Sequence, residues 1–324
     1  MESPDSRTSS PSPLDDGAAA GPLDRSSLAA WLDASPSLTD ALRGLGRAAR
    51  TDVPILILGE PGTGRSTLAR AVHRTSPRRD GELVEIDPGV VPATLFESDL
   101  FGYRAGAFTG AESHSAGRVE RAEGGTLLLD HVEEMPLGAQ PKLLRLLAER
   151  RYSPLGGRER SADVRFLATG ATDLEDRVRR GAFRSDLFYR LEVMAFVVPP
   201  LRRRLGDLPA ILERLLTDLA ERLDRPKPTL TEDAVAWMSE YGWPGNLRQL
   251  RNVLERAMVV SGDGPLDPEP PRDAASRPQT LRELEEEHIR RTLAYTRGRQ
   301  GRAADLLGIS RKALWEKRKR YGIP

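Results

Sequence analysis

The sequence predicts an α/β fold with a mainly parallel sheet, followed by a helical lid subdomain and a separate all-helical domain. Between residues 26 and 200, short apolar segments alternate with amphipathic helical segments, a pattern typical of parallel sheets with helices on both faces. From 201 to 261 only helical periodicity is found, and the segment from 280 to 324 is helical and increasingly basic. Residues 1–25 and 262–279 lie outside these three predicted domains.

Composition excludes several classes of site. The 324 residues include 49 Lys and Arg against 48 Asp and Glu, so the net charge of +1 indicates no class of partner. The absence of cysteine excludes disulfides, thiolate metal sites and cysteine nucleophiles. No apolar run approaches the roughly 18 residues of a membrane span, and the N-terminus has no signal pattern. We therefore expect a cytoplasmic protein with no membrane partner.

The predicted elements follow in a regular order. Residues 1–25 are rich in Ser, Pro, Asp, Gly and Ala, and we expect disorder because they cannot bury enough apolar surface. The predicted strands are at 53–58, 83–86, 126–130 and 164–169, and the predicted helices are at 66–74, 140–149, 208–223 and 232–241. The Pro-rich segment 262–279 is expected to be a semi-extended linker.

A glycine-rich segment joins the first predicted strand to the first helix. It consists of Gly59, Glu60, Pro61, Gly62, Thr63, Gly64, Arg65 and Ser66. Its glycines let backbone N–H groups point at phosphate oxygens, next to a helix N-terminus that favours anions. Ser66 stands where a hydroxyl would bind Mg²⁺, but Arg65 replaces the expected Lys, and the exchange is not conservative. We predict a nucleotide-binding loop; an ordinary glycine-rich turn is the alternative.

A second nucleotide motif is predicted at the end of strand 126–130. Asp130 would lie at the carboxyl edge of the sheet, where it can hold the Mg²⁺ shell. His131 stands where a Glu would polarise the attacking water. A neutral imidazole could act as a general base, or His131 could simply be a polar cap on the strand. Glu133 and Glu134 follow closely, but strand-end geometry does not obviously place either at the water.

An unaltered hexapeptide gives the sequence its resemblance to a known family. It consists of Gly106, Ala107, Phe108, Thr109, Gly110 and Ala111. With flanking motifs at 97–102, 124–127, 183–191, 199–202 and 243–248, it resembles the sigma-54-dependent transcriptional activators, or NtrC-like AAA+ regulators. The resemblance extends from about residue 30 to the C-terminus. It implies an AAA+ core that binds ATP and Mg²⁺ and engages the sigma-54 RNA polymerase holoenzyme.

The resemblance assigns the hexapeptide to a surface loop at the tip of a helical insertion. Phe108 would be the exposed contact to sigma-54, and Thr109 would support it. An exposed Phe among small residues suits a mobile contact loop. Without the resemblance, a buried turn with Phe108 in the core would be the favoured interpretation.

The resemblance also implies a ring, which is hexameric in most members. Arg184 and Arg190 would be arginine fingers that reach the γ-phosphate of a neighbouring subunit, although either could be a surface ion-pair partner. Arg248 would be the sensor arginine of the lid. Ala171 departs from the family pattern, because it replaces an Asn that reads the γ-phosphate.

The sequence therefore predicts one of two functions. The first is a DNA-binding regulator that binds ATP and engages sigma-54 RNA polymerase through residues 106–111. The alternative is a hydrolysis-deficient family member that acts as a DNA-binding or ring-partner regulator, because Arg65, His131 and Ala171 are altered together. A AAA+ remodelling protein unrelated to sigma-54 fits the hexapeptide poorly. Residues 1–25 are too short for a sensory domain, so we expect constitutive activity or control by a separate partner.

The C-terminal segment has helix-turn-helix spacing and resembles the Fis-type domain found at this place in the family. Thr280 is a candidate N-cap, a short helix after 301 ends at a Gly turn, and a basic helix follows. Ala303 and Ala304 would allow close packing, and Ile309 and Leu314 would fill the core. A solvated basic tail is the alternative.

Double-stranded DNA is the predicted ligand of this domain. The predicted DNA-binding residues are Ser310, Arg311, Lys312, Trp315, Arg318 and Lys319. Arg318 and Lys319, with Lys317 and Arg320, would mainly neutralise phosphates, so binding should weaken steeply with salt. A homo-oligomer, from a dimer to a hexameric ring, is expected, because paired recognition helices match paired half-sites.

Overall fold

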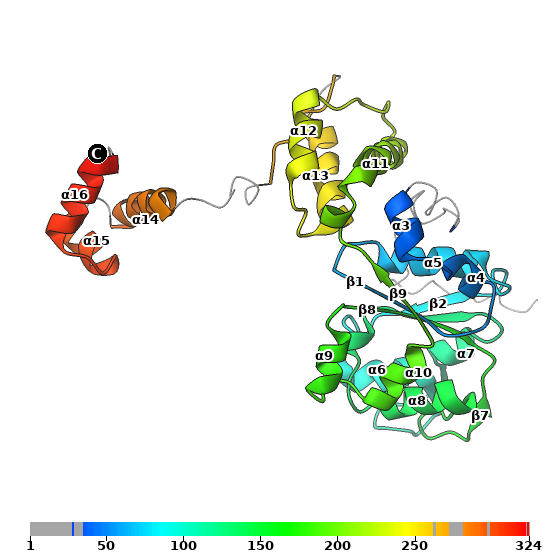
Figure 1. Cartoon of the computed structure of the whole chain (residues 1–324). Coiled ribbons are helices and arrows are strands. Elements are labelled where there is room, and N and C mark those ends of the chain that lie inside the picture. Colours follow the sequence, from blue (N-terminus) through cyan, green and yellow to red (C-terminus); the bar gives the residue numbers. More distant parts are fainter. Residues whose placement is uncertain are drawn as a thin grey trace, which may run out of the picture. The chain divides into compact units, whose positions relative to one another are not determined.

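The computed structural model of the chain describes residues 28, 35–261, 264–271, 281–296, 299–321 and 323 (Figure 1). They divide into two compact units, one ending at Glu269 and the other beginning at Pro270. The segment 1–25, most of the linker 262–279 and the candidate cap Thr280 lie outside the described residues. Within the described part, no helix is long and apolar enough to cross a membrane.

A parallel five-stranded sheet forms the centre of the first unit, which confirms the predicted fold class. The strand order is β2-β5-β8-β1-β9. The carboxyl ends of β1, β5 and β8 meet at one edge, because Leu58 pairs with Gly170 and Leu129 with Ala168. The bounds are β1 Ile55–Gly59, β2 Leu83–Ile86, β5 Thr126–Leu129, β8 Arg165–Gly170 and β9 Met194–Val198.

Helices cover both faces of this sheet (Figure 1). Alternate strand residues face opposite ways: Leu127 and Leu129 join one core, and Leu128 joins the other. The first core includes residues of α6 (Ala93–Phe101), α7 (Arg118–Arg121), α8 (Gln140–Glu149), α9 (Leu174–Arg179) and α10 (Ser185–Leu191). The second includes residues of α3 (Pro36–Ala41), α4 (Leu45–Ala49) and α5 (Arg65–Thr75).

A helical subdomain follows β9. It consists of α11 (Leu208–Leu223), α12 (Glu232–Glu240) and α13 (Asn246–Val260), preceded by the 3₁₀ turns η2 (Leu201–Arg203) and η3 (Leu205–Asp207). Trp243 is fully buried at its centre, and its indole N–H donates to the carbonyl of Met238 at 2.9 Å. The rings of Trp237 and Tyr241 lie 5.7 and 5.0 Å from that of Trp243, so one aromatic cluster organises this lid.

Removal of this central ring should destabilise the first unit. We expect Trp243→Ala to lower the free energy of unfolding by about 3–5 kcal/mol, because it leaves a cavity and an unpaired carbonyl. Val260→Ala is the control: that side chain is 80% exposed, and the change should be below about 0.5 kcal/mol. Urea unfolding followed by circular dichroism measures both, and equal small effects would contradict the packing described.

The second unit is a three-helix domain with helix-turn-helix spacing, as predicted. It contains α14 (Leu281–Tyr295), α15 (Gln300–Leu306) and α16 (Arg311–Tyr321). Ala303, Ala304 and Leu314 lie in its core, and Ile309 packs against them. Gly308, at φ 66°, makes the turn, and the Ser310 hydroxyl accepts the N–H of Ala313 at 3.1 Å and caps α16.

Candidate functional site

The glycine-rich loop and the predicted acid meet at the carboxyl edge of the sheet. Ser66, in the first turn of α5, has its Oγ 2.8 Å from Oδ2 of Asp130, which follows β5. Thr169, near the end of β8, donates to Oδ1 of the same carboxylate. Hydroxyl and carboxylate oxygens are the ligands that Mg²⁺ prefers. Ser66 and Asp130 therefore fit the metal ion of a nucleotide.

The helical subdomain contacts this loop directly. Gly62 has a φ of 79°, and a Cβ there would collide with the carbonyl oxygen of Gly245, so a larger residue does not fit. The same hypothetical atom would lie 3.1 Å from the Cβ of Arg248. The predicted sensor residue, which is exposed to solvent, thus borders the loop.

Glu60 joins the loop to the subdomain through ionic hydrogen bonds. Arg202 donates to both of its carboxylate oxygens, at 2.6 and 2.7 Å, and these bonds hold the pKa of Glu60 below its ordinary value. Asn246 donates to Glu60 at 3.3 Å and to the Pro61 carbonyl at 3.1 Å. Arg202 and Asn246 belong to motifs that the sequence analysis quoted, but it did not assign them this role.

A buried arginine supports the loop from the other direction. Arg204, only 2% exposed, donates to the Thr63 carbonyl at 3.2 Å. Burial lowers the pKa of Arg204 to about 10, and the charge of Asp207 opposes that change. Because the lid holds the loop at several points, movement of the lid would change the shape of the loop.

Arg65 occupies the lysine position of the loop in an unexpected way. Its side chain is buried, 4% exposed, and its Nη1 donates to the carbonyl of Gly59 at 2.8 Å. Burial lowers the pKa of this guanidinium, while the charges of Glu133 and Asp130 act to raise it. Its positive charge therefore lies at the base of the loop, beside two carboxylates.

His131 turns its ring toward β2. It lies in the left-handed region at φ 53°, its Nδ1 is 2.9 Å from Oδ2 of Asp87, and its backbone N–H donates to Thr169 at 3.2 Å. The sequence analysis missed Asp87 and Thr169; an acid directly after a predicted strand was the available signal for Asp87. A carboxylate at Nδ1 orients an imidazole, which is compatible with either interpretation of His131.

The end of β8 lacks the expected polar side chain. Ala171 lies directly beyond the strand, half-buried, and follows the buried Gly170. Neither residue can donate a hydrogen bond to a phosphate from its side chain. The space beside Gly170 is filled by neighbouring side chains, because a Cβ there would lie 3.1 Å from Cδ2 of Leu58 and 3.5 Å from Oε2 of Glu133.

The two candidate fingers lie on the surface of the first unit. Arg184 donates to Asp186 at 3.0 and 2.8 Å, while Arg190 donates weakly to the carbonyls of Leu147 and Ala148 at 3.3 and 3.4 Å. Among the described contacts, neither side chain hydrogen-bonds to the loop 59–66 of its own chain. A role at a phosphate would thus require a neighbouring subunit.

In the hexapeptide loop, Gly106, Phe108, Thr109 and Gly110 are exposed and Ala107 is half-buried. Ala111 is buried, so the predicted contact at this residue does not face solvent. The loop joins β3 (Gly102–Tyr103) to β4 (Ser115–Ala116), two short antiparallel strands between α6 and α7, where the resemblance implied the tip of a helical insertion. The N–H of Gly106 donates to the carbonyl of Ala111 at 2.8 Å and closes the loop. Phe108 is 43% exposed, and its ring meets the ring of Tyr103 edge-on at 5.0 Å.

The recognition helix α16 presents a cationic surface to solvent. Arg311, Lys312, Trp315 and Lys319 are exposed, and the Nζ of Lys319 lies 5.4 Å from the Trp315 ring centre. Arg318 is half-buried. Lys317 differs from the prediction of a phosphate contact, because its ammonium pairs with Glu285 of α14.

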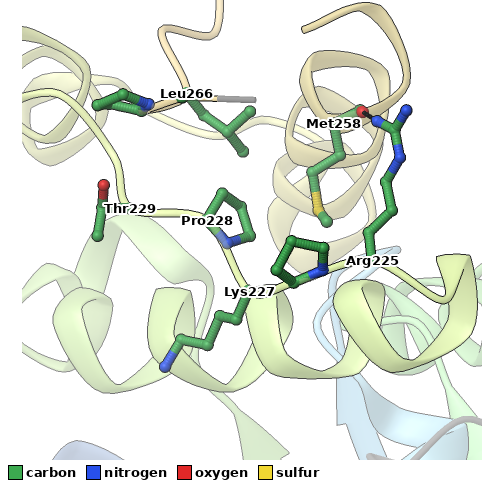
Figure 2. Close-up of a pocket in the computed structure, with 9 residues that line it drawn as sticks. Arg225, Lys227, Pro228, Thr229, Met258 and Leu266 are labelled. Carbon is green, nitrogen blue, oxygen red and sulfur yellow. Dashed lines mark hydrogen bonds between the residues drawn. The ribbon is translucent and has the colours of Figure 1, made fainter. Parts of the chain in front are cut away.

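A separate pocket of about 400 Å³ lies in the helical subdomain (Figure 2). Its lining includes the Arg225 side chain, which donates to the Met258 carbonyl, and Leu266, whose N–H donates to the Thr229 carbonyl at 2.7 Å. It has no residue in common with the loop 59–66 or with Asp130.

Models of known families match nearly all of the described chain. The sigma-54 interaction domain matches residues 32–197, and the AAA+ ATPase lid domain matches residues 202–287. The model of bacterial regulatory proteins of the Fis family matches residues 280–321. These matches coincide with the sheet-containing part, the helical subdomain and the C-terminal unit.

Individual relatives are similar to most of the chain. The chain is 42% identical to the alginate biosynthesis transcriptional regulatory protein AlgB of Pseudomonas syringae pv. tomato, over 89% of this chain and 66% of AlgB. It is 38% identical to the C4-dicarboxylate transport transcriptional regulatory protein DctD of Rhizobium meliloti, over 89% of this chain and 64% of DctD.

A solved structure is also similar to most of the chain. The crystal structure of NtrX from Brucella abortus in complex with ATP aligns with a TM-score of 0.66 at 33% identity, covering 88% of this chain and 67% of that one. The chain thus spans about two thirds of the length of the relatives that it matches.

Proposed function

The chain belongs to the family of AAA+ regulators with a sigma-54 interaction domain, and we propose that it is an ATP- and DNA-binding transcription regulator that engages sigma-54 RNA polymerase holoenzyme. The observation that carries this proposal is the convergence of Ser66 and Asp130, 2.8 Å apart, at a glycine-rich loop held by a helical lid. ATP with Mg²⁺ is the proposed ligand, since these groups supply a phosphate cradle and metal ligands.

The contact to the polymerase is assigned to residues 106–111. Phe108 is the exposed apolar anchor of this loop, and the glycines at both ends give it freedom to change shape with the nucleotide. Transcription from a sigma-54-dependent promoter tests the proposal directly. Purified holoenzyme should form transcripts only when both the protein and ATP are present, and equal transcription without the protein would refute it.

DNA binding is assigned to the exposed face of α16. Lys319→Ala should reduce the slope of log affinity against log salt by about 1, because a phosphate contact releases about one counterion. Lys317→Ala is the matched control: its ammonium pairs with Glu285, so its slope should change less. Fluorescence anisotropy with a labelled duplex measures both variants, and identical slopes for Lys319→Ala and the unaltered protein would refute the assignment.

A homo-oligomer is part of the proposal. Arg184 and Arg190 are exposed and would approach the γ-phosphate of a neighbouring subunit, where a guanidinium stabilises charge that develops during transfer. The C-terminal unit would pair two recognition helices on two half-sites. The assembly would range from a dimer to a hexameric ring.

The hydrolysis-deficient alternative depends on Arg65, His131 and Ala171, and the comparisons do not favour it. Hydrolysis needs a group that accepts the proton of the attacking water, as well as a nucleotide pocket. Steady-state phosphate release by the purified protein distinguishes the two possibilities.

A further inference from the structure

A buried acid without a complete set of partners lies beside the nucleotide loop. Glu133, in the 3₁₀ turn η1 (Val132–Glu134), is 8% exposed, and its Oε2 has no hydrogen-bond partner among the residues that the structure describes. An ionised carboxylate oxygen loses its hydration in such a place, so a purely structural role would be unfavourable. Glu133 is therefore a candidate for a functional role.

The carboxylate of Glu133 lies at the carboxyl end of β8. A Cβ placed on Gly170 would be 3.5 Å from its Oε2, so the carboxylate borders the end of β8. In the sheet, β8 is the direct neighbour of β1, which leads into the loop, and Gly170 pairs with Leu58. Because Gly170 and Ala171 have small side chains, they leave room for this carboxylate.

The imidazole of His131 lies between two carboxylates, with its Nδ1 2.9 Å from Oδ2 of Asp87 and 3.9 Å from Oδ2 of Asp130. Its partner Asp87 follows β2. In the sheet, β2 lies on one side of β5, and β1, which leads into the loop, lies on the other side. Asp130 itself is hydrogen-bonded by the hydroxyls of Ser66 and Thr169. Of the acids that follow β5, Glu133 has a buried acceptor oxygen, Oε2, with no partner among the described residues.

Electrostatics place Glu133 close to the phosphate-binding groups. Burial lowers the pKa of the Arg65 guanidinium, and of the two carboxylates that oppose this change, Glu133 acts more strongly than Asp130. Arg65 donates to Gly59 at the base of the loop. The charge of Glu133 therefore acts on the arginine of the loop.

We propose that Glu133 is the catalytic carboxylate of ATP hydrolysis in this protein, in place of the acid missing at His131. The proposal rests on the ATP site proposed above. The oxygen of a water molecule forms a bond to the γ-phosphorus as the bond from that phosphorus to the β–γ bridging oxygen breaks. The bonding electrons leave with ADP, and the proton of the water passes to the Glu133 carboxylate. The catalytic acid would then stand two residues after His131, at Glu133, and the protein would hydrolyse ATP.

Kinetics of substituted full-length protein test this assignment. Glu133→Gln should lower kcat by about 100-fold or more, with KM changed by less than about twofold, because general base catalysis contributes at least this much. Glu133→Asp should retain more turnover than Glu133→Gln. The matched control is Glu134→Gln: Glu134 is an exposed neighbour that pairs with Arg177 at 3.1 Å, and its loss should leave kcat within about twofold.

Affinity for ADP, measured by calorimetry, shows whether Glu133→Gln loses turnover because the chemical step is impaired or because the binding site no longer folds. Glu133→Gln should bind ADP at least as tightly as the unaltered protein, because it removes a negative charge from beside the phosphates. Lost ADP binding in this variant would overturn the proposal in favour of a structural role. Normal turnover in Glu133→Gln together with lost turnover in His131→Ala would assign the base to the imidazole.

The unaltered protein provides the remaining comparison. If it binds ATP without turnover, the assignment of Glu133 is overturned while the proposed ATP-binding function stands. If it binds no ATP, both are overturned.

Discussion

Replacement of Phe108 by Ala is expected to lower ATP-dependent activation of sigma-54 RNA polymerase by about 30-fold or more, without weakening ATP or DNA binding. Aromatic anchors at protein interfaces contribute about 2–4 kcal/mol when fully buried by the partner, which corresponds to this loss of affinity. The side chain is 43% exposed, and its ring contacts Tyr103 at the edge only, so its removal leaves the core intact.

In vitro transcription and direct binding to sigma-54 measure this effect. Leu137→Ala is a suitable control, because this apolar side chain is 54% exposed and precedes α8, away from the hexapeptide in sequence. It should activate like the unaltered protein. Full activation by the Phe108 variant would contradict the role assigned to the loop 106–111.

Replacement of Asp130 by Asn is expected to lower ATP turnover by about 100-fold or more. The carboxylate receives the hydroxyls of Ser66 and Thr169, and the loss of its charge removes a ligand for Mg²⁺, which is worth several kcal/mol in a phosphoryl transfer site. The amide keeps the size of the side chain, so the fold should be retained.

Phosphate release and ATP titration with and without Mg²⁺ measure the consequence. The dependence of ATP affinity on Mg²⁺ should largely disappear in the Asp130 variant. Asp173→Asn is the control, because this exposed acid also follows a strand of the sheet, β8, but pairs with Arg177 at 3.5 Å. Equal turnover in the two variants would remove Asp130 from the proposed site.

The sheet was largely predictable from the sequence, because each central strand is a short apolar run between turn signals. The prediction at 83–86 coincides with β2, and those at 53–58 and 164–169 differ from β1 and β8 by one or two residues at their ends. The edge strand β9 was missed. Its Val197 is exposed while Phe196 and Val198 are buried, and so short a run does not distinguish a strand from the end of a helix.

The position of the site was predictable for a related reason. Strand ends of a parallel sheet meet at one edge, so a loop after one strand and an acid after another must approach each other. Asp87 could have been suspected, because it directly follows a predicted strand. The contacts of Thr169 with Asp130 and of His131 with Asp87 were not predictable, because no local spacing encodes them. The contact of Arg65 was not predictable either, because the hydrogen bond from its side chain to the Gly59 carbonyl depends on how the loop folds.

The central claim is that the loop 59–66 and Asp130 form one triphosphate pocket. A calorimetric titration of the unaltered protein with ATP in the presence and absence of Mg²⁺ tests it most directly. We predict saturable binding of one ATP per chain, tightened by Mg²⁺. No saturable binding, or binding that Mg²⁺ leaves unchanged, would contradict the claim.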